Sequence, residues 1–213
     1  AAIHHQMTTV FFSLEMSRTE LAMRILSAEG KISMGRLKKG DLDTEGWTNL
    51  ATLQGRIDSA PLFIDDSPNM TLMEIRAKCR RLKQRNDLKL VVLDYLQLMS
   101  SGKKVESRQQ EVSEFSRSLK LLAKELDVPV IALSQLNRGS EQRTDKRPMV
   151  SDLRESGSIE QDADMVILLH REDMYNPDSE RVGEADMIIA KHRGGPTRTI
   201  PLAFSGKYSR FNN

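Results

Sequence analysis

The sequence contains a run of four apolar residues that ends in a carboxylate, Leu90-Val91-Val92-Leu93-Asp94. Because no polar residue interrupts the run, it predicts a strand that is buried on both faces, as in the middle of a parallel sheet. Asp94 would then stand at the carboxyl end of the strand, the edge where open α/β sheets bind ligands. There it could hold Mg²⁺ beside nucleotide phosphates, or it could only cap the next turn.

Length and composition indicate one globular domain. The 213 residues can bury a sizeable core, and we find no stretch that resembles a linker, so we expect a single domain over residues 1–213 and no second domain. No apolar run has the length of a membrane span and the first residues are not a signal peptide, which predicts a cytoplasmic protein without a membrane partner. The lone Cys79 falls at helical spacing with Ile75 and Leu82, which favours a reduced core thiol over a nucleophile.

The overall charge does not by itself indicate a nucleic-acid binder. The sequence has 32 Lys and Arg against 30 Asp and Glu, a net charge of +2. Positive charge is concentrated between Arg138 and Arg154, where five basic residues face three acidic ones. This stretch could contact DNA, or it could be a solvated charged loop.

Strand and helix patterns alternate along the chain. Ser17 to Glu20 and Thr71 to Glu74 have the spacing of capping boxes that open helices. The expected strands are residues 8–14, 61–65, 89–94, 129–134 and 164–170, and then 184–191, 197–204 and 207–211 with short turns between them. The expected helices are those opened by the two capping boxes, residues 44–57, and a long helix that ends near Asp127. We therefore predict an α/β fold with a RecA-like, mainly parallel sheet flanked by helices and an antiparallel C-terminal extension.

Glu15, Asp94 and Gln135 each stand at the carboxyl end of an expected strand. If those strands are parallel neighbours, the three side chains meet at one edge of the sheet. A glutamate there could activate an attacking water, an aspartate could organise Mg²⁺, and a glutamine could hydrogen-bond a γ-phosphate oxygen. Taken singly, Glu15 could instead favour the start of the next helix, and Gln135 could satisfy loop backbone.

Several segments, in this order, resemble the C-terminal ATPase domain of bacterial replicative helicases of the DnaB type. They are residues 13–17 (SLEMS), 93–99 (LDYLQLM), 134–138 (SQLNR), 152–157 (DLRESG) and 190–197 (AKHRGGPT). The resemblance covers essentially the whole chain and is carried by five separate motifs. It implies a ring hexamer that hydrolyses ATP with Mg²⁺, translocates along single-stranded DNA and unwinds the duplex during replication, with primase and a helicase loader as partners.

The resemblance also assigns roles by position. It implies that Glu15 is the catalytic glutamate, that Asp94 organises Mg²⁺ and that Gln135 senses the γ-phosphate. Lys191 and Arg193 match the cationic pair that reaches the nucleotide of the neighbouring subunit, where a cation would stabilise charge in phosphoryl transfer. The remaining matches, Arg154, Glu155 and Gly157, lie in the loop that holds the DNA backbone inside the ring. Contacts of that kind do not read bases.

The phosphate-binding P-loop, G-x-x-x-x-G-K-[ST], does not occur in these residues. Gly35 and Gly40 have the right separation, but Asp41-Leu42 follow instead of Lys-Ser or Lys-Thr. The resemblance implies that the P-loop and its strand directly precede residue 1, so the expected domain is incomplete and lacks its first P-loop strand. We therefore expect the 213-residue polypeptide alone to have negligible ATPase activity and to expose an apolar seam.

Two other functions fit the same residues. A RecA-like recombinase-type ATPase uses the same core without unwinding a fork. A non-catalytic oligomerisation or single-stranded-DNA-binding fragment would keep the basic loop and lose the nucleotide chemistry.

Overall fold

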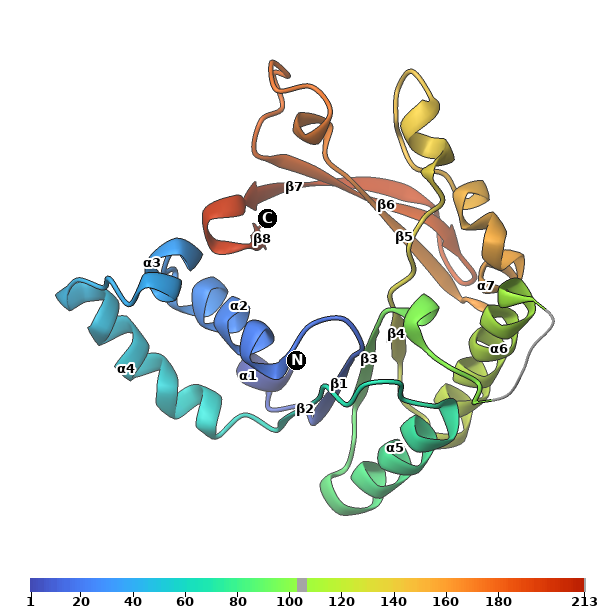
Figure 1. The fold of residues 1–213 in the computed structure, drawn as a ribbon, viewed down its shortest axis with the longest axis horizontal. Coiled ribbons are helices and arrows are strands. Elements are labelled where there is room, and N and C mark those ends of the chain that lie inside the picture. The colour runs from blue at the N-terminus through green and yellow to red at the C-terminus, as the bar shows by residue number, and fades with distance from the viewer. Residues whose placement is uncertain (103–106, 213) are drawn as a thin grey trace.

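The computed structural model describes residues 1–102 and 107–212, with the side chains of residues 154–157 outside the description. Its eight strands form two four-stranded sheets (Figure 1). The strands are β1 (Thr9–Ser13), β2 (Leu62–Asp65), β3 (Leu90–Asp94), β4 (Val130–Ala132), β5 (Met165–His170), β6 (Glu184–His192), β7 (Arg198–Ser205) and β8 (Arg210–Asn212). The helices are α1 (Ala2–His5), α2 (Arg18–Gly30), α3 (Met34–Lys39), α4 (Thr44–Asp58), α5 (Leu72–Asn86), α6 (Arg108–Leu126) and α7 (Gly157–Asp162).

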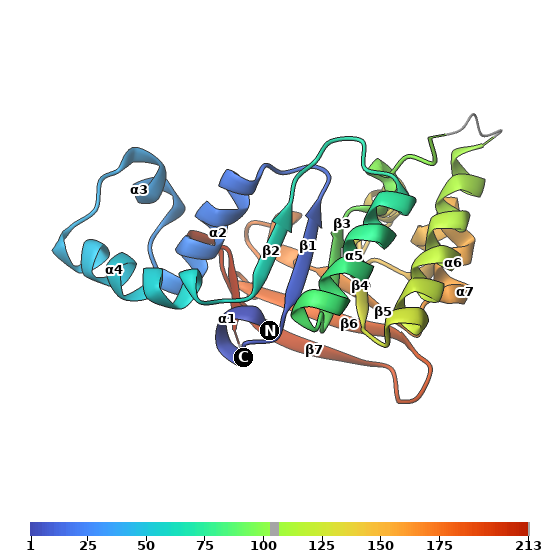
Figure 2. The same cartoon turned by 90° about the horizontal axis from the view of Figure 1, so that it is seen from below.

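The first sheet is parallel throughout and has the strand order β2-β1-β3-β4. Helices α2, α3 and α4 lie to one side of these strands and α5 and α6 to the other (Figures 1 and 2). Phe12, Val91 and Leu93 are completely buried against apolar residues of α5 and α6. The parallel, helix-flanked sheet that the alternating pattern predicts is therefore confirmed.

Strand β3 differs from its prediction in burial. Val91 and Leu93 are buried, but Leu90 and Val92 on the opposite face are only half-buried. An uninterrupted apolar run indicates that both faces of a strand can be buried. Whether each face is buried depends on which other elements pack against it. Among the described residues, α5 and α6 cover one face closely and the second face is left partly open.

The antiparallel strands form a sheet of their own, in the order β5-β6-β7-β8. The prediction of antiparallel strands at the end of the chain is confirmed, but they do not continue the hydrogen-bonded ladder of the parallel sheet. Strands β4 and β5 are each the last strand of their sheet. The ladders that the structure describes therefore leave one edge of each strand without a strand partner.

Apolar side chains are exposed on these two terminal strands. Ile131 of β4 is 52% exposed, and on β5 the alternate residues Met165, Ile167 and Leu169 are 42%, 46% and 57% exposed. The other face of β5 is buried, with Val166 and Leu168 in a small core cluster. An alternating strand with apolar residues on both faces is typical of a sheet that is covered on both sides.

Both predicted capping boxes are present. The Ser17 hydroxyl accepts from the Glu20 amide at the start of α2, and Thr71 and Glu74 make the same pair at the start of α5. Cys79 on α5 is fully buried, and burial raises the pKa of its thiol to about 12, which confirms a core thiol that stays protonated. Among the described residues, no helix is both long and apolar enough to cross a membrane.

A buried carboxylate on β6 joins the second sheet to the segment between β4 and β5. Asp186 of β6 has a side chain that is 5% exposed, and it accepts from Arg181 Nη2 at 2.7 Å and from Arg147 Nη1 at 2.9 Å. The hydrogen bond from Arg181 is the main reason that the pKa of Asp186 falls to about 2. Arg147 belongs to the basic stretch, so this cation is used for internal structure.

We expect Asp186→Asn to lower the free energy of unfolding by about 1.5–3 kcal/mol at neutral pH, because charge-assisted hydrogen bonds to two guanidinium groups are weakened. The folded-state pKa lies below the ordinary value of 3.8, so the stabilisation is present above pH 4 and is lost as the pH falls towards 2. Thermal unfolding between pH 2 and 8 measures the difference. Asp178→Asn, at an exposed position before β6, is the control. An equal Tm for both variants at pH 7 would contradict the role of Asp186.

Candidate functional site: the carboxyl edge of the parallel sheet

The ends of β1 and β3 bring two carboxylates together. In the parallel register, Ser13 at the end of β1 stands opposite Asp94 at the end of β3. The Leu14 amide donates to the Asp94 carbonyl oxygen at 2.7 Å, and the Ser13 hydroxyl bonds to both the amide and the carbonyl of Met16. The turn that carries Glu15 is therefore fixed on both sides, directly beside Asp94.

The electrostatics of Asp94 agree with this placement. Burial raises the pKa of the Asp94 carboxyl, the negative charge of Glu15 raises it further, and the positive charge of Arg24 opposes both. The chain thus holds two acidic groups close together in a partly desolvated position. A cation between Asp94 and a phosphate would relieve this cost, so the residues fit a magnesium site.

The small number of protein ligands at this edge is also compatible with Mg²⁺. Within the described part of the chain, no group of three or more His, Cys, Asp or Glu side chains is arranged to hold a metal ion. Magnesium in nucleotide sites is commonly held by one or two carboxylates together with substrate phosphates and water, and not by a complete protein cage. Asp94 therefore needs a phosphate ligand to complete such a site.

Gln135 lies beside the segment that follows Asp94. Strand β4 pairs with β3, and the Leu133 amide donates to the Leu93 carbonyl at 2.9 Å. The Gln135 amide in turn donates to the side-chain oxygen of Gln97 at 3.2 Å. The structure therefore places the backbone of Gln135 on the same edge of the sheet as Asp94.

Sequence reasoning gave no role to two residues at this edge. Arg24 lies on α2, the helix that follows Glu15, and its positive charge lowers the pKa of Asp94. Gln97 lies in the 93–99 segment, four residues after the buried run. Arg24 could have been found from its place on the helix that follows the strand-end Glu15. Nothing in the local sequence pattern pairs Gln97 with Gln135, which lies 38 positions later.

Lys191 and Arg193 are not at this edge. Lys191 Nζ donates to the carbonyl oxygens of Glu160 and Gln161 at the end of α7, and Arg193 pairs with Asp164 at 3.2 Å. In Figure 2 the arrows of β1 and β2 point to the top of the view, whereas the turn between β6 and β7 lies at the bottom. The cationic pair and the carboxylate pair therefore occupy different parts of one chain.

The basic stretch is largely engaged in internal contacts. Arg143 donates to both carboxylate oxygens of Asp152, at 2.8 Å and 2.6 Å, and Lys146 lies over the Tyr175 ring at 5.0 Å. With Arg147 bound to Asp186, three of the four cations of this stretch whose side chains the structure describes have partners within the chain. These contacts are not those of a freely solvated charged loop.

For the predicted DNA-contact residues, the structure describes the backbone and not the side chains. Arg154 and Glu155 fall in a short helix, Val150–Ser156, and Gly157 begins α7. Their side chains are outside the described residues, so their roles stay predictions. The backbone shows that the loop leads directly into the helix whose last carbonyls bind Lys191.

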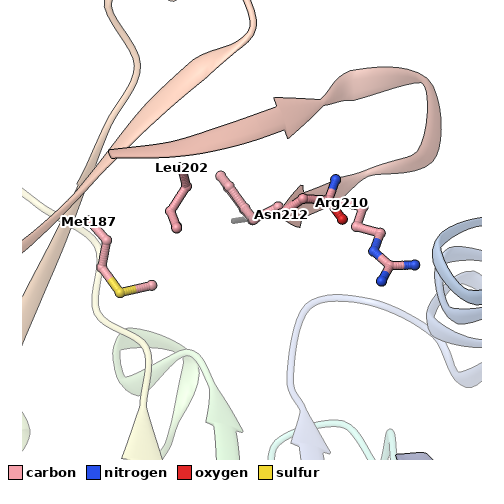
Figure 3. Close-up of a pocket in the computed structure, with 5 residues that line it drawn as sticks. Met187, Leu202, Arg210 and Asn212 are labelled. Atoms are coloured by element: carbon pink, nitrogen blue, oxygen red, sulfur yellow. The ribbon is translucent and has the colours of Figure 1, made fainter. Parts of the chain in front are cut away.

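A hollow also lies on the antiparallel sheet. It is lined by Met187, Leu202, Arg210, Phe211 and Asn212 (Figure 3). Arg210, its charged member, donates to the carbonyl oxygen of Ala28 at the end of α2 at 3.0 Å. This bond joins β8, beside the hollow, to α2.

Comparison with known proteins gives the family. The sequence model described as the DnaB-like helicase C terminal domain matches residues 1–213. The chain belongs to this family. Among curated DnaB-family relatives, the replicative DNA helicase DnaB of Leifsonia xyli subsp. xyli is 70% identical over 99% of the chain, and that of Geobacillus stearothermophilus is 57% identical over 95%.

Solved structures of DnaB-like proteins share the fold. The ATPase domain of G40P matches with a TM-score of 0.93 and 43% identity over 97% of this chain and 74% of that chain. A DnaB-like replicative helicase studied with primase gives the same TM-score and identity, over 97% of this chain and 50% of that chain. The chain spans 46% of the Leifsonia xyli relative and 45% of the Geobacillus stearothermophilus relative, which is about half the length of each.

In this DnaB-family chain, we expect Asp94→Asn to raise the Tm at pH 8. Burial and the charge of Glu15 raise the pKa of Asp94, so ionising this carboxyl costs folding free energy above the raised pKa. The gain should shrink as the pH falls through that pKa towards the ordinary value of 3.8, because the carboxyl of the unsubstituted protein is then neutral as well. Thermal unfolding at pH 4 and pH 8 measures it.

Asp87→Asn is the matched control, because the pKa of Asp87 is shifted in the opposite direction from that of Asp94. Asp87 pairs with Lys89 at 2.8 Å, which lowers its pKa, so its substitution should not raise the Tm at pH 8. A lower Tm for Asp94→Asn than for the unsubstituted protein at pH 8 would show that the Asp94 carboxylate stabilises the fold.

Proposed function

We propose that residues 1–213 are part of the ATP-driven motor domain of a replicative DNA helicase, which translocates on single-stranded DNA and unwinds the duplex during replication. The observation that carries the proposal is the meeting of Glu15, Asp94 and the Gln135 backbone at the carboxyl edge of a parallel sheet. Membership of the DnaB-like family supports it. The relatives are named replicative DNA helicases, and one solved neighbour is described with primase.

In this proposal the substrate is ATP, and each residue of the edge has one task. Asp94 holds Mg²⁺, which when bound neutralises charge on the β- and γ-phosphates. Glu15 orients and deprotonates the attacking water, and Gln135 donates a hydrogen bond to a γ-phosphate oxygen. Because Asp94 lies in a partly desolvated position beside Glu15, burial and the charge of Glu15 raise the pKa of the Asp94 carboxyl, and a bound cation would favour its ionised form.

The phosphate cradle has to come from elsewhere. The sequence has no G-x-x-x-x-G-K-[ST] pattern, and β4 and β5 each end a sheet with exposed apolar side chains. We infer that a further strand lies between these two edges and carries the P-loop, as in an incomplete RecA-like domain. Residues 1–213 alone should then have negligible ATPase activity.

The separate position of Lys191 and Arg193 favours action in trans. Their side chains are held by α7 and Asp164, away from the Glu15 and Asp94 of the same chain. We infer that identical subunits form a ring hexamer in which this pair completes the nucleotide site of the neighbour. Arg154, Glu155 and Gly157 would then face single-stranded DNA in the channel, with primase and a helicase loader as cytoplasmic partners.

The function is tested in a chimaera in which residues 1–213 replace the matching segment of the Leifsonia xyli relative. ATP-dependent strand displacement is the expected result. ATP hydrolysis stimulated by DNA without displacement would favour a recombinase-type ATPase. Binding of single-stranded DNA that ignores ATP would favour a non-catalytic fragment.

In that chimaera we expect Glu15→Gln to preserve ATP binding and to lower kcat for hydrolysis by about 10²–10⁴-fold, because the amide cannot accept the proton of the water. Nucleotide binding and phosphate release are measured separately. Glu45→Gln, at an exposed position of α4, is the control that should leave both unchanged. Near-normal turnover in Glu15→Gln would remove Glu15 from the catalytic role.

We expect Arg193→Ala to lower hydrolysis in assembled rings by about 10³–10⁵-fold, the range for a charge-stabilising arginine. Mixing this variant with Glu15→Gln should restore part of the activity, because a subunit with an intact Arg193 can complete the site of a neighbour with an intact Glu15. Arg198→Ala, at the exposed start of β7, is the control. Mixed rings that stay inactive would count against action in trans.

A further inference from the structure

We propose that Gln97 is a positioning residue that holds Gln135 in register with Asp94, an inference that rests on the proposed role of Gln135 at the γ-phosphate. Gln97 lies in the short helix Leu96–Leu98, directly after β3. Its side chain reaches across to the segment that follows β4. Gln135 is thereby joined to the end of the strand that carries the magnesium-binding carboxylate.

The contact is a two-sided clasp between a side-chain amide and backbone groups. Gln97 Oε1 accepts from the Gln135 amide at 3.2 Å. Gln97 Nε2 donates to the Gln135 carbonyl oxygen at 3.3 Å and to the Ser134 hydroxyl at 2.9 Å. Only a side chain with both a donor and an acceptor can make this set of bonds.

The clasp stands where the sheet ladder stops. Strand β4 ends at Ala132, so the backbone of residues 133–135 no longer has the regular pairing of a strand. The Leu133 carbonyl still accepts from the Leu96 amide at 3.0 Å, and the Gln97 side chain supplies the next bonds. In effect the side chain extends the β3–β4 pairing by one step, which fixes the direction in which Gln135 leaves the sheet.

Gln97 is itself held from α6. Arg108 Nη2 donates to the Gln97 carbonyl at 2.6 Å and to the Met99 carbonyl at 2.8 Å, and Arg108 pairs with Glu111. Glu111 is 5% exposed, and its Oε1 accepts from the Ser101 amide at 2.7 Å. The backbone around Gln97 is thus braced by the first turn of a long helix, as a positioning residue requires.

The consequence for catalysis is geometric. Asp94 and Gln135 act on the same phosphates in the proposed site, so a change in their separation misplaces one of the two. Misplacement of a contacting group by about 1 Å can lower a rate by about 10²-fold. Gln97 therefore affects the steps that need the γ-phosphate, and it leaves binding of a nucleoside diphosphate unchanged.

The test is a double-mutant cycle in the chimaera, with Gln97→Met, Gln135→Ala and the double variant. Methionine keeps the length of glutamine and removes both hydrogen-bonding groups. We expect Gln97→Met to lower kcat about 10–100-fold with unchanged ADP affinity, and the double variant to be no slower than Gln135→Ala alone. Gln54→Met, on the exposed face of α4, is the control.

A second variant, Gln97→Glu, separates the donor from the acceptor. The ionised carboxylate can accept from the Gln135 amide but cannot donate to the Gln135 carbonyl, whereas the protonated acid can do both. The activity of Gln97→Glu relative to Gln97→Met should therefore rise as the pH is lowered. A residue that only fills space gives a ratio that does not depend on pH.

The possible failures can be told apart. If Gln135→Ala leaves hydrolysis unchanged, the proposed role of Gln135 is wrong, and the positioning role of Gln97 is overturned as well. If Gln135→Ala is slow but its effect and that of Gln97→Met multiply independently in the double variant, only the clasp is overturned. Loss of ADP affinity in both Gln97 variants would also overturn it, because a general structural role would then explain the data.

Discussion

The parallel pairing of β1 with β3 is the constraint on which the rest of the site depends. It places Ser13 opposite Asp94, and the bond from the Leu14 amide to the Asp94 carbonyl oxygen holds the following turn, which carries Glu15, beside Asp94. A shift of the register by one residue would turn Asp94 to the opposite face of the sheet. The buried side chains Phe12, Val91 and Leu93 prevent such a shift, because it would expose the core. The core packing therefore fixes the relative positions of the residues in the proposed catalytic site.

The same register makes the site electrostatically costly. The pKa of Asp94 is raised by burial and by Glu15, so the charged form that would hold Mg²⁺ under the proposed function is the form that the fold disfavours. Elsewhere the chain does the opposite: Asp186 lies between two arginines and its pKa is held at about 2. Asp186, with two internal cationic partners, serves the fold. Among the described residues no cation is hydrogen-bonded to Glu15 or Asp94, and such a carboxylate pair is suited to an external ligand.

The sequence was sufficient for the features that depend on local pattern. Apolar runs and capping boxes predicted most strands and helices, and the placement of Glu15 and Asp94 at strand ends predicted their meeting. The expected strand over residues 207–211 was wrong in its first half, because Gly206–Tyr208 form a short helix and β8 begins only at Arg210. The sequence was insufficient where a contact depends on distant segments. Burial of both faces of β3 was not found because the cover of each face comes from other elements. The basic stretch was left open between a DNA contact and a solvated loop because the partner of Arg147, Asp186, lies 39 residues later. Gln97 was missed for the same reason. The roles of Arg154, Glu155 and Gly157 stay predictions.

The position of the cationic pair gives the strongest argument for assembly under the proposed function. Lys191 and Arg193 are fixed by the end of α7 and by Asp164, and the turn that carries Arg193 lies away from the carboxyl edge of the parallel sheet. Under the proposed function, the cation at one place would complete the nucleotide site at the other through a heterologous contact with a second copy. Repeated contacts of this kind close into a ring when the rotation between subunits permits closure. Lys191 bonds to carbonyl oxygens at the end of α7, and α7 directly follows the predicted DNA loop, so the proposed nucleotide contact and the proposed DNA contact lie at the two ends of one short helix.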